Sequence, residues 1–385
     1  MMKKILIIAT SSDSLMIFRK ALIVDFQKKY FDVHVAAPNI NSNTVIREQL
    51  DNLGVAYHQI KLDRTGLNIY SDFLSIISLT KLIFQIKPDY VLSYTIKPVI
   101  YGAIVSKFLG VKNIYSLITG LGYIFISLDD SKYKTTKLQK IVFVLYKISL
   151  FFSKKVIFQN PDDANLFEDM KLVNPEKINI VNGSGVDLSF YDYDISILED
   201  YTSEQSLKFL MLGRIIGDKG IREYIGAARE LKKKYGKKVV FQLGGGLDTN
   251  PTAILKEELD EWINTGIIEY LGELKDVRPA ITNSHVFILP SYREGTSRSI
   301  LEAMSVGRPI ITTNVAGCRQ LVEVGKNGYL AEPKSVQSLI KEIDKIIQLS
   351  SSEIVKMGSY SRKIVEEKYD VRKVNKDMLS IMGVV

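Results

Sequence analysis

Short apolar runs of strand length alternate along the chain with longer segments of helical periodicity. In the first half, the strand-type runs cover residues 4–9, 33–37, 57–62, 90–94, 113–119, 156–159 and 177–181. Helical patterns cover residues 69–86, 98–109 and 133–152, and another passes through Phe18 and Arg19. Strands that alternate with helices favour a parallel sheet covered by helices.

The alternation restarts after residues 191–206, an acidic stretch without clear periodicity that we expect to be a linker. Strands are expected at 209–212, 239–243, 267–270, 286–289 and 310–313, and helices at 219–235, 253–264, 278–283, from 298, 336–348 and 353–367. The sequence thus predicts an α/β protein with two domains of one architecture, residues 1–190 and 207–369. A site is expected in a cleft between them.

The stretch that follows the expected strand 286–289 reads P-S-Y-R-E-G-T-S-R-S-I-L-E-A-M-S-V-G-R-P. A turn is expected from Glu294 to Ser297, and Ser297 can cap a helix that starts near Arg298. Glu302 falls opposite the apolar face of that helix, free to meet water or a ligand. A helix N-terminus favours phosphate, whereas two carboxylates suit sugar hydroxyls. The alternative is a pair of solvated surface carboxylates.

Polar residues also follow two other expected strands. Arg214 follows strand 209–212 after Gly213, Lys219 opens the next helix, and Gly245 lies in the Gly-Gly-Gly run after strand 239–243. The carboxyl ends of parallel strands meet at one sheet edge, so Arg214 and Lys219 are expected to bind one diphosphate. The alternatives are two exposed cations and, for Gly245, a simple tight turn.

The nine residues from Glu294 to Glu302 match the E-x7-E signature of retaining glycosyltransferase family 4. The longer run resembles bacterial members that assemble polysaccharides and lipid-linked glycans. This resemblance implies the GT-B fold, two Rossmann-like doubly wound domains that face each other across a cleft. It implies that Arg214 and Lys219, within G-R-x4-K-G, bind the donor diphosphate, that Glu294 orients the donor sugar, and that Glu302 binds the ribose.

The resemblance extends to other donor and acceptor residues. The donor set is expected to include Gly295, Thr296, Ser297, Gly245, Ser12 and, in a loop beside the nucleobase, Leu274. The acceptor set is expected to include Ser14, Gly120, Gly122 and Arg19, although Arg19 alternatively reads as a helix-surface arginine. Residues 370–385 are expected to cross back to the first domain.

Charge is distributed unevenly between the two halves of the chain. The net charge is +8, and residues 1–190 hold 23 Lys/Arg against 16 Asp/Glu. A basic half predicts an acidic partner, and without a recognised nucleic-acid module we expect lipid or diphosphate rather than nucleic acid. Residues 131–155 carry seven lysines and no acid among apolar residues. That stretch either lies on an anionic membrane or packs into the core with a solvated lysine face.

The remaining signals concern metals, histidines and compartment. We read Asp192-Tyr193-Asp194 as linker rather than a D-x-D metal motif, and expect no metal or other cofactor. His34, His58 and His285 are read as structural. The single cysteine, Cys318, fits a reducing compartment and a small buried residue. The first apolar run is too short for a signal peptide.

We therefore expect a metal-independent retaining glycosyltransferase. It would move a hexose or N-acetylhexosamine from a nucleotide diphosphate sugar, expected to be UDP-linked, to an undecaprenyl-diphosphate-linked glycan. The expected location is cytoplasmic, at the inner face of the plasma membrane. The alternatives are a non-hydrolysing nucleotide-sugar epimerase or hydrolase of the same fold, and a non-enzymatic sugar-binding scaffold.

Overall fold

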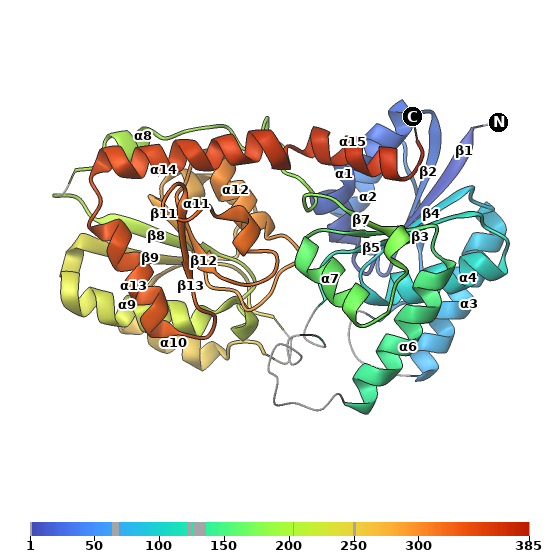
Figure 1. The fold of residues 1–385 in the computed structure, drawn as a ribbon, viewed down its shortest axis with the longest axis horizontal. Helices are drawn as coiled ribbons and strands as arrows, with labels where there is room; N and C mark the ends of the chain where they lie inside the picture. The colour runs from blue at the N-terminus through green and yellow to red at the C-terminus, as the bar shows by residue number, and fades with distance from the viewer. Residues whose placement is uncertain are drawn as a thin grey trace. The chain divides into compact units, whose positions relative to one another are not determined.

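The computed structural model of the protein describes residues 2–63, 69–121, 125, 136–202, 204–248 and 252–384. The chain forms two compact units (Figure 1). Unit 1 comprises Met1–Ser184 and Arg372–Val385, and unit 2 comprises Gly185–Val371. Each unit is a parallel sheet covered by helices, which confirms the predicted α/β class.

Unit 1 is built on a seven-stranded sheet with the order β3-β2-β1-β4-β5-β6-β7. Its strands are β1 Lys3–Ile8, β2 Phe31–Ala37, β3 Ala56–Gln59, β4 Tyr90–Tyr94, β5 Asn113–Ile118, β6 Lys155–Phe158 and β7 Ile178–Ile180. Its helices are α1 Ser12–Lys28, α2 Thr44–Asn52, α3 Ile69–Ile86, α4 Ala103–Phe108, α6 Lys137–Phe152 and α7 Pro161–Asp169, joined by the C-terminal α15 Val371–Ile381.

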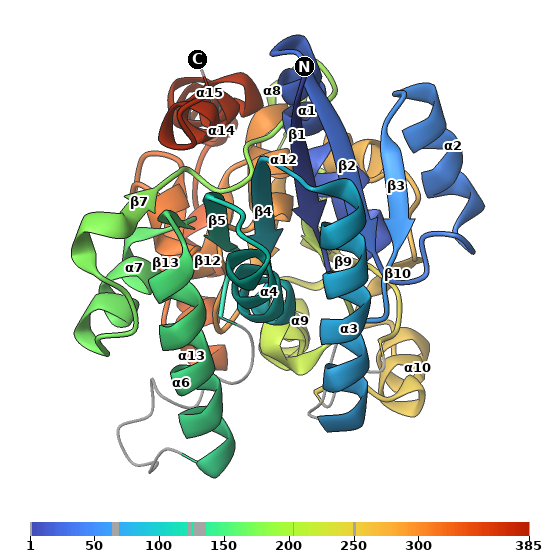
Figure 2. The same cartoon turned by 90° about the vertical axis from the view of Figure 1, so that its right-hand side faces the viewer.

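Two apolar cores flank the sheet of unit 1, because successive side chains of a strand point to opposite faces. On β1, Ile5 and Ile7 join the core that contains α1, α2 and α15 residues. Leu6 and Ile8 join the core formed with α3, α4 and α6. Figure 2 shows α3, α4 and α6 side by side on that second face.

Unit 2 is built on a six-stranded sheet with the order β10-β9-β8-β11-β12-β13. The strands are β8 Leu207–Leu212, β9 Val239–Gly244, β10 Glu269–Gly272, β11 Val286–Leu289, β12 Ile310–Thr313 and β13 Gly328–Ala331. The helices are α8 Ser196–Glu199, α9 Ile221–Tyr235, α10 Lys256–Asn264, α11 Arg278–Thr282, α12 Arg298–Val306, α13 Val336–Ile347 and α14 Ser351–Ile364. β8 lies between β9 and β11, as the expected clustering of strand ends requires.

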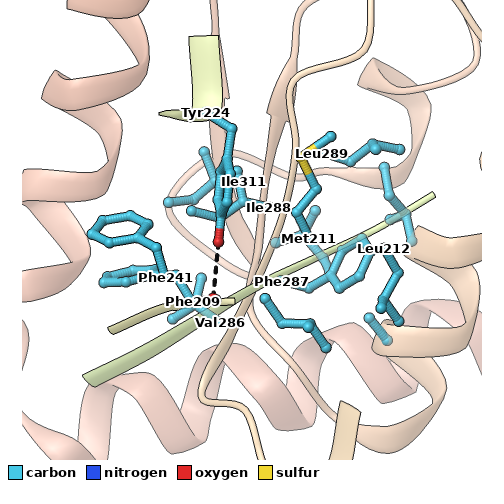
Figure 3. Packing of buried hydrophobic residues seen from close by; sticks show 14 of the residues in the cluster. Phe209, Met211, Leu212, Tyr224, Phe241, Val286, Phe287, Ile288, Leu289 and Ile311 are labelled. Carbon is cyan, nitrogen blue, oxygen red and sulfur yellow. Dashed lines mark hydrogen bonds between the residues drawn. The ribbon is translucent and has the colours of Figure 1, made fainter. Parts of the chain in front are cut away.

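The core of unit 2 fills both sides of these central strands (Figure 3). The rings of Phe209 and Phe241 stack with centroids 5.0 Å apart. Tyr224 of α9 lies fully buried beside them, and its hydroxyl donates to the backbone oxygen of Phe209 at 2.9 Å. This bond satisfies the polar end of an otherwise apolar residue and anchors α9 over β8.

Two expectations about chain organisation need correction. Residues 191–206 are not a free linker, since Tyr191 and Leu198 are buried in the core of unit 2, and the chain divides after Ser184 instead. The prediction failed because the stretch packs on the helices of unit 2 with a few isolated apolar side chains. These side chains have no regular spacing in the sequence that would have shown their burial. The helices α2 and α7 and the strand β13 were also not predicted.

The C-terminal tail lies in unit 1, where α15 covers one face of the sheet. The hydroxyl of Tyr115 donates to the backbone oxygen of Met382 at 2.8 Å, and Asn375 Nδ2 donates to Asp25 at 2.8 Å. The tail therefore completes a domain that the N-terminal part of the chain begins. Across the described part of the chain, every helix is too short or too polar to span a bilayer.

Candidate functional site

The carboxyl ends of β8 and β11 bring Lys219 and Glu294 into direct contact. Their side chains form an ion pair and are 19% and 15% exposed. Ser291 Oγ donates to Glu294 Oε1 at 2.8 Å, which fixes the carboxylate from a second side. Two residues that lie 75 positions apart in the sequence thus form one polar cluster at the sheet edge. The sequence placed both residues at this edge but did not predict that they pair with each other.

Gly220 explains why Lys219 reaches this position. Its backbone has a φ of +74°, and a Cβ there would lie 2.0 Å from the backbone oxygen of Pro290. The amide of Tyr292 donates to the backbone oxygen of Asp218 at 2.8 Å. The turn before α9 is therefore held against the end of β11, and only glycine permits the close approach.

A loop that the sequence reasoning missed holds the turn of Glu294. Gly317 has a φ of +74°, and a Cβ there would lie 2.3 Å from the backbone oxygen of Glu294. The backbone amide of Glu294 donates to the backbone oxygen of Ala316, and the backbone amide of Ser297 donates to that of Gly317. Gly317, four residues after the end of β12, was the available signal for this loop.

The N-terminus of α12 follows from this turn. Ser297 occupies the capping position with extended backbone, but its side chain makes no capping hydrogen bond, contrary to its expected role. Thr296 Oγ1 donates to the backbone oxygen of Gly295 at 2.9 Å. The first-turn amides of a helix lack intrahelical acceptors, so this end of α12 suits an anion.

Glu302 is not the free carboxylate that the helical pattern predicted. It is buried, and Arg298 Nε donates to its Oε1 at 2.9 Å. Tyr191 also forms a hydrogen bond with it, and burial together with the nearby Glu302 charge raises the pKa of Tyr191. The outer face of α12 is covered because the segment expected to be a linker packs on it, with Tyr193 against Gly307.

Arg214 follows β8 next to Gly213, which lies against the side chain of Lys219. Its guanidinium, however, donates to Asp248 Oδ2 at 2.9 Å, and its side chain is 46% exposed. Asp248 was not predicted as a partner. The structure thus joins Lys219 to Glu294, Arg214 to Asp248, and Glu302 to Arg298, rather than bringing the four expected side chains into one direct contact.

Gly245 lies where two loops approach closely. Its φ is +151°, and a Cβ there would lie 1.8 Å from the backbone oxygen of Gly213. The hydroxyl of Tyr270 donates to its backbone oxygen at 2.6 Å. The side chain of Leu274 lies beside Gly244, 3.2 Å from the position that a Cβ on Gly244 would take. The glycine run therefore brings the loops after β8, β9 and β10 together, more than a simple turn requires.

In unit 1, the expected residues that the structure describes lie in α1, which follows β1, and after β5. Ser14 Oγ donates to the backbone oxygen of Ser11 at 2.6 Å and lies 2.7 Å from the hydroxyl of Tyr94. Asn43 donates to Ser12 Oγ at 3.2 Å. Gly120 follows β5 with a φ of +115°, whereas Gly122 lies outside the described residues.

Arg19 is buried, so its interpretation as a helix-surface arginine is wrong. Its guanidinium lies over the ring of Tyr94, 5.0 Å from the centroid. Burial raises the pKa of Tyr94 to about 12, against the opposing effect of the Arg19 charge. Beside Tyr94, Thr95 adopts a φ of +70°, an uncommon conformation for a β-branched residue, and donates to Thr10 Oγ1 at 3.1 Å.

The residues considered for metal binding or nucleophilic chemistry have local partners. Asp194 accepts the amide of Ser196 at 3.0 Å and its hydroxyl at 2.6 Å. Cys318 is buried, and burial raises the pKa of its thiol to about 12. Among the described residues, no three His, Cys, Asp or Glu side chains are grouped to hold a metal ion.

The three histidines lie on or beside strands. His34 Nδ1 and His58 Nε2 are 2.9 Å apart between β2 and β3. His285 Nδ1 accepts the amide of Lys208 at 3.0 Å, and burial lowers the pKa of His285 to about 4. A buried, neutral His285 that accepts a backbone hydrogen bond has a structural environment.

Comparison with known proteins connects this geometry to a family. Residues 4–160 match the family model "Glycosyl transferase 4-like", and residues 206–349 match "Glycosyl transferases group 1". A Campylobacter jejuni protein, N,N'-diacetylbacillosaminyl-diphospho-undecaprenol alpha-1,3-N-acetylgalactosaminyltransferase, is 26% identical over 338 residues, 86% of each chain. An Escherichia coli protein, UDP-Gal:alpha-D-GlcNAc-diphosphoundecaprenol alpha-1,3-galactosyltransferase, is 27% identical over 303 residues, 74% of each chain.

Solved structures share the fold. Sucrose-phosphate synthase from Thermosynechococcus elongatus aligns with a TM-score of 0.80 at 14% identity over 98% of each chain. Anabaena HepE in complex with UDP and glucose aligns with a TM-score of 0.74 at 18% identity over 100% of each chain. With two parallel-sheet domains and a family match in each, the chain belongs to the family 4-like glycosyltransferases of GT-B fold.

Proposed function

We propose that the chain transfers a hexose or N-acetylhexosamine from a UDP-linked donor to a glycan carried on undecaprenyl diphosphate. The bond from the anomeric carbon to the diphosphate breaks, and the acceptor hydroxyl attacks the oxocarbenium-like sugar from the same face. The configuration of the anomeric carbon is thereby retained. The diphosphate leaves with the bonding electron pair, and its departing oxygen takes up the proton that the acceptor hydroxyl loses.

The contact between Lys219 and Glu294 carries this proposal. An ammonium group at the end of β8 suits the charge that develops on a departing diphosphate. A carboxylate at the start of the turn before α12 suits the hydroxyls of a donor sugar. Because Glu294 also holds Lys219, the cation is fixed before the donor arrives.

The other donor residues have supporting roles in the proposal. Arg214 is half-exposed, and it would exchange Asp248 for a diphosphate oxygen. Glu302 would accept the ribose hydroxyls while it remains paired with Arg298, because an ionised carboxylate has about four lone-pair sites. The N-terminus of α12 would add backbone amides to the diphosphate, so that these groups meet the leaving charge without a metal ion.

Two observations support the acceptor. The C. jejuni and E. coli relatives are named for acceptors linked to undecaprenol through a diphosphate. Residues 1–190, with a net charge of +7, would favour an anionic diphosphate at a membrane surface. We place the enzyme in the cytoplasm, peripheral to the inner face of the plasma membrane.

A two-step experiment tests the proposal. Nucleotide sugars are first screened for thermal stabilisation of the protein, and those that bind are incubated with and without an undecaprenyl-diphosphate-linked acceptor. Transfer predicts an acceptor that gains one sugar and a nucleotide diphosphate that appears only with acceptor present. An epimerised donor, or nucleotide released equally without acceptor, supports the epimerase or hydrolase instead.

A further inference from the structure

Helix α6 of unit 1 presents an apolar stripe outward. Its inner face is buried through Val142, Tyr146 and Leu150. Four apolar residues of the same helix are nevertheless exposed: Ile141, Val144, Ile148 and Phe151. The aromatic side chain among them, Phe151, is 73% exposed. The spacing i, i+3, i+7, i+10 places these four side chains on one face. A helix on the surface of a soluble domain normally presents polar residues there.

The neighbouring helices extend this apolar surface. α4 packs against both α3 and α6, and the three helices lie side by side in Figure 2. Phe108, at the end of α4, is 79% exposed, and its ring lies 6.3 Å from that of Phe152. Tyr70, Phe73 and Phe84 are exposed on α3. Exposed apolar residues gathered on three adjacent helices indicate an interaction site.

Lysines are interleaved with the apolar residues. Lys137, Lys140 and Lys147 are exposed on α6, as are Lys107 on α4 and Lys81 on α3. The only acid within these three helices is Asp72, and Lys97 Nζ donates to it at 2.8 Å. The surface formed by the outward residues of α3, α4 and α6, here called the α3/α4/α6 face, is therefore apolar and positively charged.

We propose that the α3/α4/α6 face docks unit 1 on an anionic phospholipid bilayer, with the apolar side chains in the interfacial layer. Lysine side chains can extend from among apolar neighbours to reach anionic headgroups. A second copy of this chain fits less well, because a symmetric contact would bring the lysines of α6 against the same lysines. The inference rests on the proposed function for its purpose, which is to hold the enzyme where a lipid-linked acceptor lies.

Vesicle flotation with the full-length protein tests the inference. The vesicles contain phosphatidylcholine alone or phosphatidylcholine with phosphatidylglycerol. The wild type is expected to float with the anionic vesicles and to be released by salt. The triple variant Lys137→Glu/Lys140→Glu/Lys147→Glu is expected to bind about 100-fold more weakly, since each lysine contributes roughly fivefold. Ile148→Ser/Phe151→Ser is expected to bind about tenfold more weakly.

Matched controls lie on unit 2. Lys237→Glu/Lys238→Glu/Lys256→Glu makes the same change in net charge at exposed lysines, and Leu255→Ser removes another exposed apolar side chain. Both are expected to bind as the wild type does. Vesicle binding that the α6 substitutions leave unchanged, or that the controls weaken equally, would overturn the inference. So would a concentration-dependent dimer that the α6 substitutions abolish.

A second readout separates this inference from the proposed function. Transfer to a short-chain, water-soluble diphosphate acceptor is expected to be unaffected by the α6 substitutions, because they leave unit 2 unchanged. A wild type that binds vesicles but transfers no sugar would reject the proposed function and leave the docking surface standing. A wild type that transfers sugar but never floats would do the reverse.

Discussion

The pair formed by Lys219 and Glu294 offers the most informative perturbation. Lys219→Met and Glu294→Gln each remove one charge and keep most of the side-chain volume. Either substitution leaves the other group largely buried without its partner, and the double variant removes both charges together. Comparing the four proteins isolates the interaction from the individual roles of the two groups.

The expected magnitudes follow from burial. Breaking a fully buried pair costs about 3–5 kcal/mol, and an exposed pair contributes about 0–1 kcal/mol. With side chains 19% and 15% exposed, this pair lies between these limits, and each single variant should lose roughly 2 kcal/mol of unfolding free energy. The double variant should recover most of that loss. Turnover should fall about 100- to 1000-fold in all three variants.

The assay measures thermal unfolding and sugar transfer on the same preparations. The control is the pair Lys233 and Glu230 on α9, which has a 2.8 Å contact but side chains that are 67% and 50% exposed. Lys233→Met and Glu230→Gln should change neither quantity appreciably.

The outcome for the double variant decides between two roles. If the pair acts on the donor, stability returns in the double variant but turnover does not. If turnover returns together with stability, the pair only supports the fold, and the proposed chemistry at this sheet edge is refuted.

Three further predictions follow from single residues. Arg214→Ala should lower turnover about 100-fold with little change in melting temperature. Asp248→Asn should keep its turnover, because in the proposal the diphosphate replaces Asp248 as the partner of Arg214. Equal losses of turnover in the two variants would argue against that exchange. Gly220→Ala should abolish transfer and lower the unfolding free energy of unit 2, measured by urea unfolding, by more than about 2 kcal/mol, because the added Cβ would meet Pro290. The control is Gly266→Ala, which also changes a glycine with positive φ but has open space around it. This control should lose only about 1 kcal/mol. The pKa of His285 is lowered from 6.5 to about 4 by folding, so the unfolded chain binds the proton at a higher pH than the folded chain does. The wild type should therefore lose stability as the pH falls from 6.5 to 4, and His285→Asn should lose up to about 3 kcal/mol less over that range. Identical pH profiles for the two proteins would contradict this prediction.

Much of the fold could be predicted because apolar runs and turns carry local signals. The strands β4, β11 and β12 and the helix α3 begin and end at the predicted residues. The helices α2 and α7 were missed, although Asn43 and Asn160 cap them with side chains that accept backbone amides. Capping signals therefore existed, but the helices are short and amphipathic patterns over nine residues are weak.

The candidate site was predictable only in part, for a physical reason. The placement of Lys219 beside Glu294 follows from strand order, which alternating strands and helices constrain. The partners Asp248, Tyr191 and Gly317 come from loops and from the segment 185–206, whose paths depend on packing. The prediction that Glu302 is exposed was wrong, because helical periodicity identifies the apolar face of a helix but not the segments that cover its other face.

The most direct measurement follows the acceptor itself. Purified protein is incubated with UDP-sugars and an undecaprenyl-diphosphate-linked acceptor, and the product is analysed by mass spectrometry and by NMR of the new anomeric centre. The account predicts an acceptor that gains one hexose or N-acetylhexosamine with the anomeric configuration of the donor, formed about 100- to 1000-fold more slowly by Lys219→Met or Glu294→Gln. An unchanged acceptor with every donor, or a product of inverted configuration, would contradict it.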